Sequence, residues 1–354
     1  MSYIGAVQNC AEDIQDALEM HFTGNGNGIS PDQRPFLQFV NNQVKTAGIK
    51  QVINPSPAKK KTVNLLYRQP LVHTDIDQTD STNCTTGDDL GNMLEEYTID
   101  TADGGDWNGL NATFALSQLH CIDEPFEVFF AKELARLVDG VDAKVSYKTA
   151  TTLATLSGTW ADDVEATYTV TANRLQVDYQ DSSNNYNPSR FYEVMDAVTM
   201  NGFGSNVAMF GGAKLHGLAR HALAGCCTSN GVELQQLWGQ FGFASVYDRD
   251  VATALGSGSA YSVITKPGAV ALLTFNEAGW KNGVSLIQGG SNYIQFSIVS
   301  PKTGTPMDVL VTDACKAVTI SVRACTKLVG LPTDLFQSND NFSGVKFVNK
   351  LQAV

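Results

Sequence analysis

The strongest constraint on the fold is one amphipathic stretch, residues 123–140. Its apolar side chains recur every three or four positions, so on a helix they fall on one face. They are Phe126, Phe129, Phe130, Leu134, Leu137 and Val138. Asp123 is placed to cap the first free amides, Pro125 suits the first turn, and Gly140 is placed to end the helix. The pattern predicts a helix of about four to five turns lying with one face on a larger body.

Composition and charge narrow the classes of function. The 354 residues are 43% apolar and 17% charged, which is typical of a folded protein. A net charge of −12 argues against a general nucleic-acid-binding surface, which needs clustered Lys and Arg. The chain has no secretory-type start and no apolar run near the roughly 18 residues of a membrane helix, so we expect a cytoplasmic product without a membrane partner.

The seven cysteines have no Cys-x-x-Cys spacing, which favours reduced, mostly buried thiols over disulfides or metal ligands.

Charge is divided into two blocks ahead of the predicted helix. Every charged side chain of residues 33–74 is positive, and prolines there favour an extended chain. Residues 69–131 hold thirteen Asp and Glu and neither Lys nor Arg. Surfaces normally mix the two signs. We therefore predict that one block neutralises the other, either within the subunit or between subunits.

The remaining chain mixes helices and strands without a regular βαβ rhythm, which predicts an α+β fold. Residues 7–21 form a predicted helix, and residues 24–28 a flexible linker. Residues 93–99 suit a strand or a helical turn, followed by a tight turn at 103–106. Further helices are predicted at 189–200 and 213–223, and strands at 164–171, 206–212, 241–247, 262–264, 293–299, 307–311 and 317–328, with 267–275 a turn and then strand or helix.

One run matches a catalytic motif literally. Asp75-Ile-Asp77-Gln-Thr79 has the Asp-x-Asp-x-Thr pattern of haloacid-dehalogenase-type phosphotransferases, in which the first Asp attacks phosphorus. That chemistry needs the end of a buried strand, but Pro70 lies where ladder hydrogen bonds are required. We favour an acidic loop and keep a Mg²⁺-dependent phosphotransferase as an alternative, which loss of phosphatase activity in Asp75→Asn would support.

No other set of residues predicts catalysis or metal binding. Carboxylates at 75, 77, 80, 88 and 89 could hold a divalent cation but lack EF-hand spacing. His216 and His221 are five positions apart and do not share a helix face as two zinc ligands would. We predict no enzyme, no cofactor and no catalytic or metal residues.

Two later regions carry a family resemblance. Residues 191–198 followed by 206–219 look like a helix, a buried strand and a second helix of one domain, and residues 243–250 with 261–270 look like its later strands. With the order of arm, acidic hairpin, long helix, β region and mixed lobe, the chain resembles the major capsid protein of tailed bacteriophages. That fold, the Johnson fold, is shared with encapsulins and herpesvirus capsid floor domains.

The resemblance implies an α+β capsid fold with five parts. They are an N-terminal helix and extended arm at 1–65, an extended loop at 66–120, a spine helix and peripheral domain at 121–200, an axial domain at 201–330, and a return to the peripheral domain at 331–354.

The function implied is structural. Copies would assemble into pentamers and hexamers of an icosahedral head that encloses double-stranded DNA without binding it specifically. The chain would form in the host cytoplasm, reside in the virion, and meet portal, scaffolding and decoration proteins besides itself. A tail or adhesin-like binding protein is the alternative if residues 140–180 and 290–330 form one β-sandwich, and an encapsulin-type nanocompartment shell shares the fold.

If the resemblance holds, the two charge blocks would form contacts between neighbouring subunits. Each surface ion pair in such a contact would contribute about 0–1 kcal/mol. Reversing Lys59, Lys60 and Lys61 to Glu should then block assembly. The predicted intersubunit residues are Lys59, Lys60, Lys61, Arg68, Asp75, Asp77, Asp80, Asp88, Asp89, Glu95, Glu96, Asp103 and Asp106.

Overall fold

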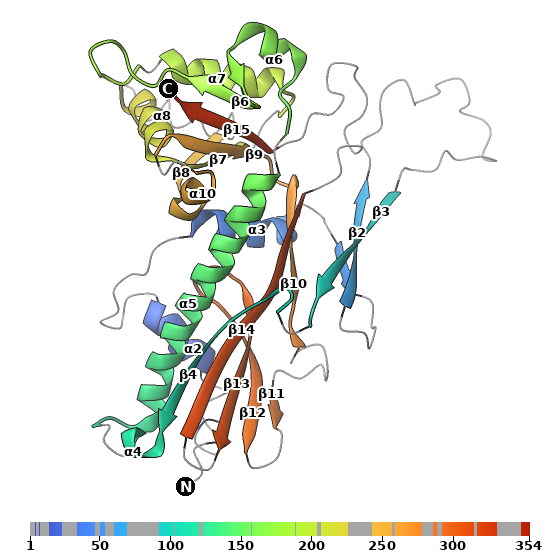
Figure 1. Ribbon diagram of the computed structural model, residues 1–354, viewed down its shortest axis with the longest axis vertical. Coiled ribbons are helices and arrows are strands. Elements are labelled where there is room, and N and C mark those ends of the chain that lie inside the picture. The colour runs from blue at the N-terminus through green and yellow to red at the C-terminus, as the bar shows by residue number, and fades with distance from the viewer. Residues whose placement is uncertain are drawn as a thin grey trace, which may run out of the picture.

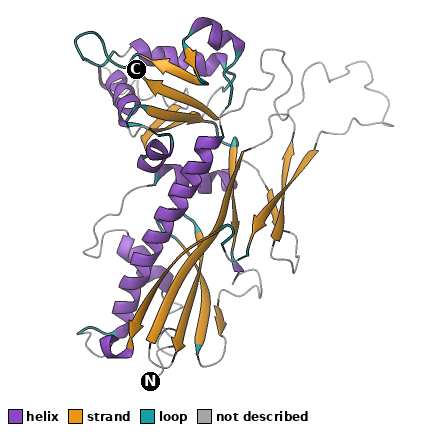
Figure 2. Ribbon diagram, in the orientation of Figure 1, coloured by secondary structure: helices purple, strands orange, loops and turns teal. Residues whose placement is uncertain are grey.

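The computed structural model combines two six-stranded sheets, a three-stranded sheet and one long helix (Figure 1). The mixture of helices and antiparallel strands in Figure 2 confirms the predicted α+β class. The structure describes residues 4, 7, 14–22, 34–46, 50–53, 60–68, 92–102, 104–119, 123–156, 158–187, 189–203, 207–225, 243–256, 259–277, 286–288, 292–314, 317–330 and 348–354.

Helix α5 (Phe126–Thr155) is the predicted amphipathic helix, but it is 30 residues long and continues well past Gly140. Of the six predicted face residues, Phe126 and Phe129 are partly buried and the other four are buried. The predicted end was wrong because Gly140 serves packing: a Cβ there would lie 2.4 Å from Leu110 Cδ1. The predicted cap was also wrong, since Pro125 occupies the N-cap position and makes no side-chain cap bond.

The six-stranded sheet along α5 is here called the spine sheet. Its longest strand, β14 (Ala317–Gly330), pairs antiparallel with β13 (Pro306–Ala314), with β10 (Val270–Phe275) and with β4 (Trp107–Ala115). The short helix α4 (Leu116–Leu119) connects β4 toward α5. Beyond β13 follow β12 (Tyr293–Val299) and then β11 (Leu286–Gln288). The strands predicted at 293–299, 307–311 and 317–328 are confirmed, and the open choice at 267–275 is a strand.

The second six-stranded sheet forms the lobe at the end of α5, here called the distal lobe (Figure 1). Its strands follow the order β5-β6-β15-β9-β7-β8, with β6–β15 and β7–β8 parallel. They are β5 (Val170–Thr171), β6 (Arg174–Val177), β7 (Val207–Gly211), β8 (Phe243–Tyr247), β9 (Tyr261–Thr265) and β15 (Val348–Ala353).

The described residues place four helices in the distal lobe. They are α6 (Asp162–Thr167), α7 (Ser189–Met200), α8 (Ala213–Gly225) and α10 (Arg249–Ala254). The helices predicted at 189–200 and 213–223 are confirmed, as is the fully buried strand β7. The strand predicted at 164–171 was wrong for most of its length. Only Val164 of α6 is buried, and the acids in its first turn favour a helix.

A three-stranded sheet, here called the side sheet, projects beside the spine sheet (Figure 1). Its strands are β1 (Lys50–Ile53), β2 (Lys60–Arg68) and β3 (Asn92–Asp100), so the open choice at 93–99 is a strand. The extended character predicted for 33–74 holds for β1 and β2. It was wrong for α3 (Pro35–Thr46), where Pro35 occupies the first helical position and Phe36, Leu37 and Val40 are buried.

Helix α2 (Ile14–Phe22) covers part of the range predicted as a helix, and its residues Ile14 and Leu18 are buried. The side-chain amide of Gln15 donates to the carbonyl of Val299 (3.0 Å) and accepts from its N–H (3.2 Å). An amide thus occupies backbone groups of β12 that would otherwise remain open at the sheet margin.

Strand pairing groups the chain differently from the predicted domain ranges. Residues 270–330 belong to the spine sheet with β4, rather than to the lobe of residues 207–265. The C-terminal strand β15 lies between β6 and β9 in the distal lobe. The chain therefore passes between these two sheets three times, from β4 to β5, from β9 to β10 and from β14 to β15.

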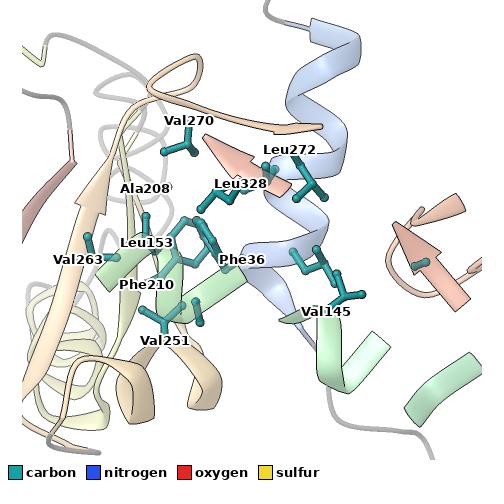
Figure 3. Packing of buried hydrophobic residues seen from close by; sticks show 14 of the residues in the cluster. Phe36, Val145, Leu153, Ala208, Phe210, Val251, Val263, Val270, Leu272 and Leu328 are labelled. Carbon is teal, nitrogen blue, oxygen red and sulfur yellow. The ribbon is translucent and has the colours of Figure 1, made fainter. Parts of the chain in front are cut away.

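The main core is continuous across the junction of the two lobes. Figure 3 shows Leu153 of α5 and Phe36 of α3 beside Phe210 of β7, with Leu272 and Leu328 from the spine sheet. All five side chains are buried. The lobes are therefore joined by packed apolar surface as well as by the chain itself.

Candidate assembly interface

The side sheet is anchored to the spine sheet by a small apolar cluster of its own. Val63 of β2 and Ile99 of β3 are fully buried against Phe275 and other residues of β10 and β14. At one margin the Lys327 ammonium donates to the carbonyl of Thr98 (2.6 Å). The base of the projecting sheet is therefore fixed by its own chain.

Lys61 points into this anchor. It is 6% exposed, and its ammonium lies 6.0 Å from the centroid of the Phe275 ring. Such a cation over an aromatic face is attracted by about 0.5–2 kcal/mol. Lys61 was predicted to be an intersubunit contact, but the structure places it inside its own subunit.

The two charge blocks meet within the chain where they are described. Strands β2 and β3 pair antiparallel, with Lys60 opposite Asp100 and Leu65 opposite Glu95. The basic strand therefore lies beside the acidic strand of the same subunit. Backbone pairing thus brings parts of the two blocks together within one subunit, while mutual neutralisation of their charges stays a prediction.

The turn from β3 to β4 sets how the side sheet leaves the spine sheet. Asp106 accepts the N–H of Asp100 (2.9 Å) and lies 3.6 Å from the Lys148 ammonium on α5. The Trp107 indole donates to the carbonyl of Thr101 (3.0 Å). A Cβ on Gly105 would lie 2.5 Å from the Asp100 carbonyl oxygen, so glycine is required for this close approach. The predicted tight turn is confirmed for its described residues.

The predicted intersubunit residues are thus dispersed. Glu96 is exposed on β3, whereas Asp106 and Lys61 make contacts within the subunit. Lys60, Arg68 and Glu95 lie on β2 and β3. Outside the described residues lie Lys59, Asp75, Asp77, Asp80, Asp88, Asp89 and Asp103, and with them the Asp-x-Asp-x-Thr motif.

Sequence reasoning missed the role of Asp248, which caps two helices. The carboxylate is 2% exposed, and its Oδ1 accepts the Val251 N–H of α10 at 3.0 Å. Its Oδ2 accepts the Phe36 N–H at the start of α3, also at 3.0 Å. Burial raises the pKa of Asp248 above its ordinary value, although both amides lower it. Its position just before a helical run was the available signal for one cap, but the second partner is 212 residues away.

Helix α3 is bound on its other side by the turn between β12 and β13. The Asn41 amide donates to the carbonyl of Thr303 (2.8 Å) and to Thr305 Oγ1 (3.0 Å). Gln38 donates to the carbonyl of Lys302 (2.6 Å). Since Asp248 belongs to the distal lobe and this turn to the spine sheet, α3 bridges the two.

Two carboxylates of α5 lie beneath this bridge. Asp142 is fully buried and accepts hydrogen bonds from the hydroxyls of Ser300 (2.5 Å) and Thr303 (2.7 Å). Asp139, one turn earlier, lies 3.1 Å from Arg34 and 3.2 Å from Lys302. Burial raises the pKa of Asp142 to about 6, against the lowering by both hydroxyls and by Arg34.

The described residues offer little catalytic chemistry. They contain no group of three His, Cys, Asp or Glu side chains positioned to hold a metal ion. His216 is within 3.1 Å of Ser245 Oγ, and burial lowers its pKa, whereas His221 lies against the Tyr186 ring. No helix in this part of the chain is long and apolar enough to cross a membrane.

No family model matches the chain, and no curated protein matches it. Among solved structures it is similar to the Cyanophage A-1(L) capsid asymmetric unit, with 11% identity over 91% of this chain and 93% of that chain, and a TM-score of 0.49. It is similar to the capsid structure of Cyanophage P-SCSP1u, with 9% identity over 84% of each chain and a TM-score of 0.43.

A structure from Mycobacterium phage Adephagia has 10% identity, with 84% of this chain and 86% of that chain covered and a TM-score of 0.40. These are phage structures, the class that the sequence resemblance indicated.

Proposed function

We propose that this chain is the major capsid protein of a tailed phage, which assembles into the pentamers and hexamers of an icosahedral head around double-stranded DNA. The observation that carries the proposal is the path of the chain. Strand β4 enters the spine sheet, α5 runs along it into the distal lobe, and β10–β14 return to the same sheet. A spine helix crossed by returning strands is the arrangement that the family resemblance implies.

The parts are assigned accordingly. The spine sheet with α5 is the peripheral domain, and the distal lobe is the axial domain that faces the centre of each ring. The side sheet and the segment it carries form the extended loop, and α3 belongs to the N-terminal arm. Portal, scaffolding and decoration proteins are the further partners expected, with assembly in the host cytoplasm and final residence in the virion.

The proposed mechanism is geometric. A helix of 30 residues is about 45 Å long, and a sheet along its length makes a stiff plate. The side sheet projects from this plate, so it is free to overlap an adjacent copy and to fix its register. A net charge of −12 suits a shell whose inner surface must not bind tightly to the DNA it encloses.

The condition stated for the adhesin-like alternative is not met. It required residues 140–180 and 290–330 to form one β-sandwich. Residues 126–155 are instead helical, and β5 and β6 belong to a different sheet from β12–β14. An encapsulin-type shell remains an outcome of the experiment below.

The proposal is tested by expressing the full chain alone and together with a scaffolding protein, if a neighbouring gene encodes one. Particle size comes from negative-stain microscopy and mass from light scattering. Rings of five and six subunits, or closed shells, support the proposal. A monomer or trimer under every salt condition contradicts it, and shells that take up protein cargo but never DNA point to the encapsulin-type alternative.

A matched pair of variants tests the side sheet itself. Glu96→Lys changes an exposed residue on β3, whereas Glu127→Lys makes the same charge change on the exposed face of α5. We expect the first to reduce the yield of closed particles and the second to leave it unchanged. Equal yields from both would remove the side sheet from the proposed contacts.

A further inference from the structure

The distal lobe presents opposite charges at opposite ends of its sheet. The sheet order places β5 at one edge and β8 at the other. Helix α6 directly precedes β5, and α10 directly follows β8. Figure 1 shows α6 on one side of the lobe and α8 and α10 on the other.

The end at α6 is acidic. Asp162, Asp163 and Glu165 are all exposed, and Val164 is the one buried residue of this helix. None of the three carboxylates forms an ion pair with a described residue. The nearest cations in the sequence are engaged elsewhere. Arg174 lies over the Tyr261 ring, Lys148 pairs with Asp106, and Arg190 pairs with Asp178 and Glu193.

The end at β8 is basic and partly aromatic. Tyr247, the last residue of β8, is 43% exposed. Arg249, the first residue of α10, and Arg220 on α8 are also exposed. Neither arginine forms an ion pair within the described part of the chain. The acids nearest in sequence are occupied, since Asp248 caps two helices and Asp250 accepts the Ser146 hydroxyl at 2.5 Å.

Tyr and Arg are the residue types most enriched among the energetically dominant contacts of protein interfaces. The two charged ends cannot meet within one subunit, because the width of the sheet separates them. A second copy of this chain is the partner that carries both complementary surfaces. A contact between two different surfaces of identical subunits is heterologous, and it closes into a ring when the rotation between subunits allows.

We propose that the α6 carboxylates of one copy dock on the end formed by Tyr247, Arg249 and Arg220 of the next copy. This inference rests on the proposed function and assigns the charged contact that joins neighbouring distal lobes around a ring. The acidic end and the basic end are used once each per subunit, so every contact in a closed ring is satisfied.

A charge exchange tests the contact. Arg249→Glu and Asp163→Arg each place like charges together across the interface, and the double variant restores opposite charges in every contact of a ring. We expect each single change to raise the protein concentration for half-maximal ring formation about tenfold, and the double variant to recover most of it. Sedimentation velocity measures the assembled fraction. In about 1 M salt, where the screening length is about 3 Å, the differences should shrink.

The control is Arg136→Glu, an equal charge change at an exposed residue of α5 away from the distal lobe. Circular dichroism of all variants checks that they fold. If the unaltered chain forms rings but the single variants assemble equally well, or the double variant is not rescued, the contact is wrong and the proposed function stands. If the unaltered chain stays monomeric, the proposed function fails and this contact fails with it.

Discussion

Replacing Asp142 by Asn should stabilise the subunit near neutral pH, although it removes two charge-assisted hydrogen bonds. The carboxyl is fully buried, and its pKa is raised to about 6 from an ordinary value near 3.8. The folded protein therefore binds the Asp142 proton more tightly than the unfolded chain does. Asn keeps the shape of the neutral acid, and its oxygen can still accept from Ser300 or Thr303.

The sign and size follow from proton linkage. A raised carboxyl pKa contributes stability below the unfolded pKa, and that stability is lost as pH rises through the folded pKa. The full difference is about 3 kcal/mol, and about 1.4 kcal/mol of it should disappear between pH 5 and pH 8. Arg34, Asp139 and Lys302 face the same site, and their charges are unchanged by the substitution.

The assay is urea unfolding of unassembled protein at several pH values, followed by tryptophan fluorescence. The free energy of unfolding of Asp142→Asn should exceed that of the unaltered chain at pH 8, and the gap should narrow by about 1.4 kcal/mol at pH 5. A gap that is constant across pH would refute the ionisation argument. A variant that is less stable at every pH would mean that the charge-assisted bonds outweigh desolvation.

Three further changes test the fold. Asp248→Ala should lower the free energy of unfolding by about 2–4 kcal/mol, because it removes a helix cap and leaves the Phe36 N–H without its acceptor, whereas Asp248→Asn should cost less. Gly211→Ala should lower soluble yield sharply, since φ is 133° and a Cβ would lie 2.8 Å from the Tyr261 carbonyl oxygen. Gly256→Ala is the milder control, because φ is 99° there but no atom lies within 4 Å of the added Cβ. Lys61→Glu should lower the thermal midpoint of unassembled subunits, and a defect confined to assembly would contradict its buried position.

The sequence predicted only the first half of α5, because Gly140 was taken as the end of the helix. Beyond Gly140 the buried face continues at helical spacing through Val141, Val145 and Leu153. It also buries the polar residues Asp142, Ser146 and Thr149, whose burial hydrophobic periodicity cannot predict. Their partners lie far along the chain: Ser146 contacts α10, and Asp142 contacts the turn after β12.

The candidate interface was predictable in part. Two opposite charge blocks close in sequence led us to predict mutual neutralisation, and the strands β2 and β3 that carry parts of these blocks are paired along their backbones. Sequence alone could not tell which face of β2 is buried, because either face of an isolated strand can turn inward. The burial of Lys61 depends on Phe275, more than 200 residues away.

Helix α3 explains why the junction of the two lobes needs polar contacts as well as apolar ones. The Phe36 and Phe39 rings meet Phe210 at centroid distances of 5.3 and 5.0 Å, and such packing alone allows rings to slide. The hydrogen bonds from Asn41 to the β12–β13 turn and from Phe36 to Asp248 are directional, so they fix the first turn and the middle of the helix. If copies of the chain assemble as proposed, a small error in the angle between lobes would be repeated at every contact. A helix bonded to both lobes limits that angle within each subunit, before any neighbour binds.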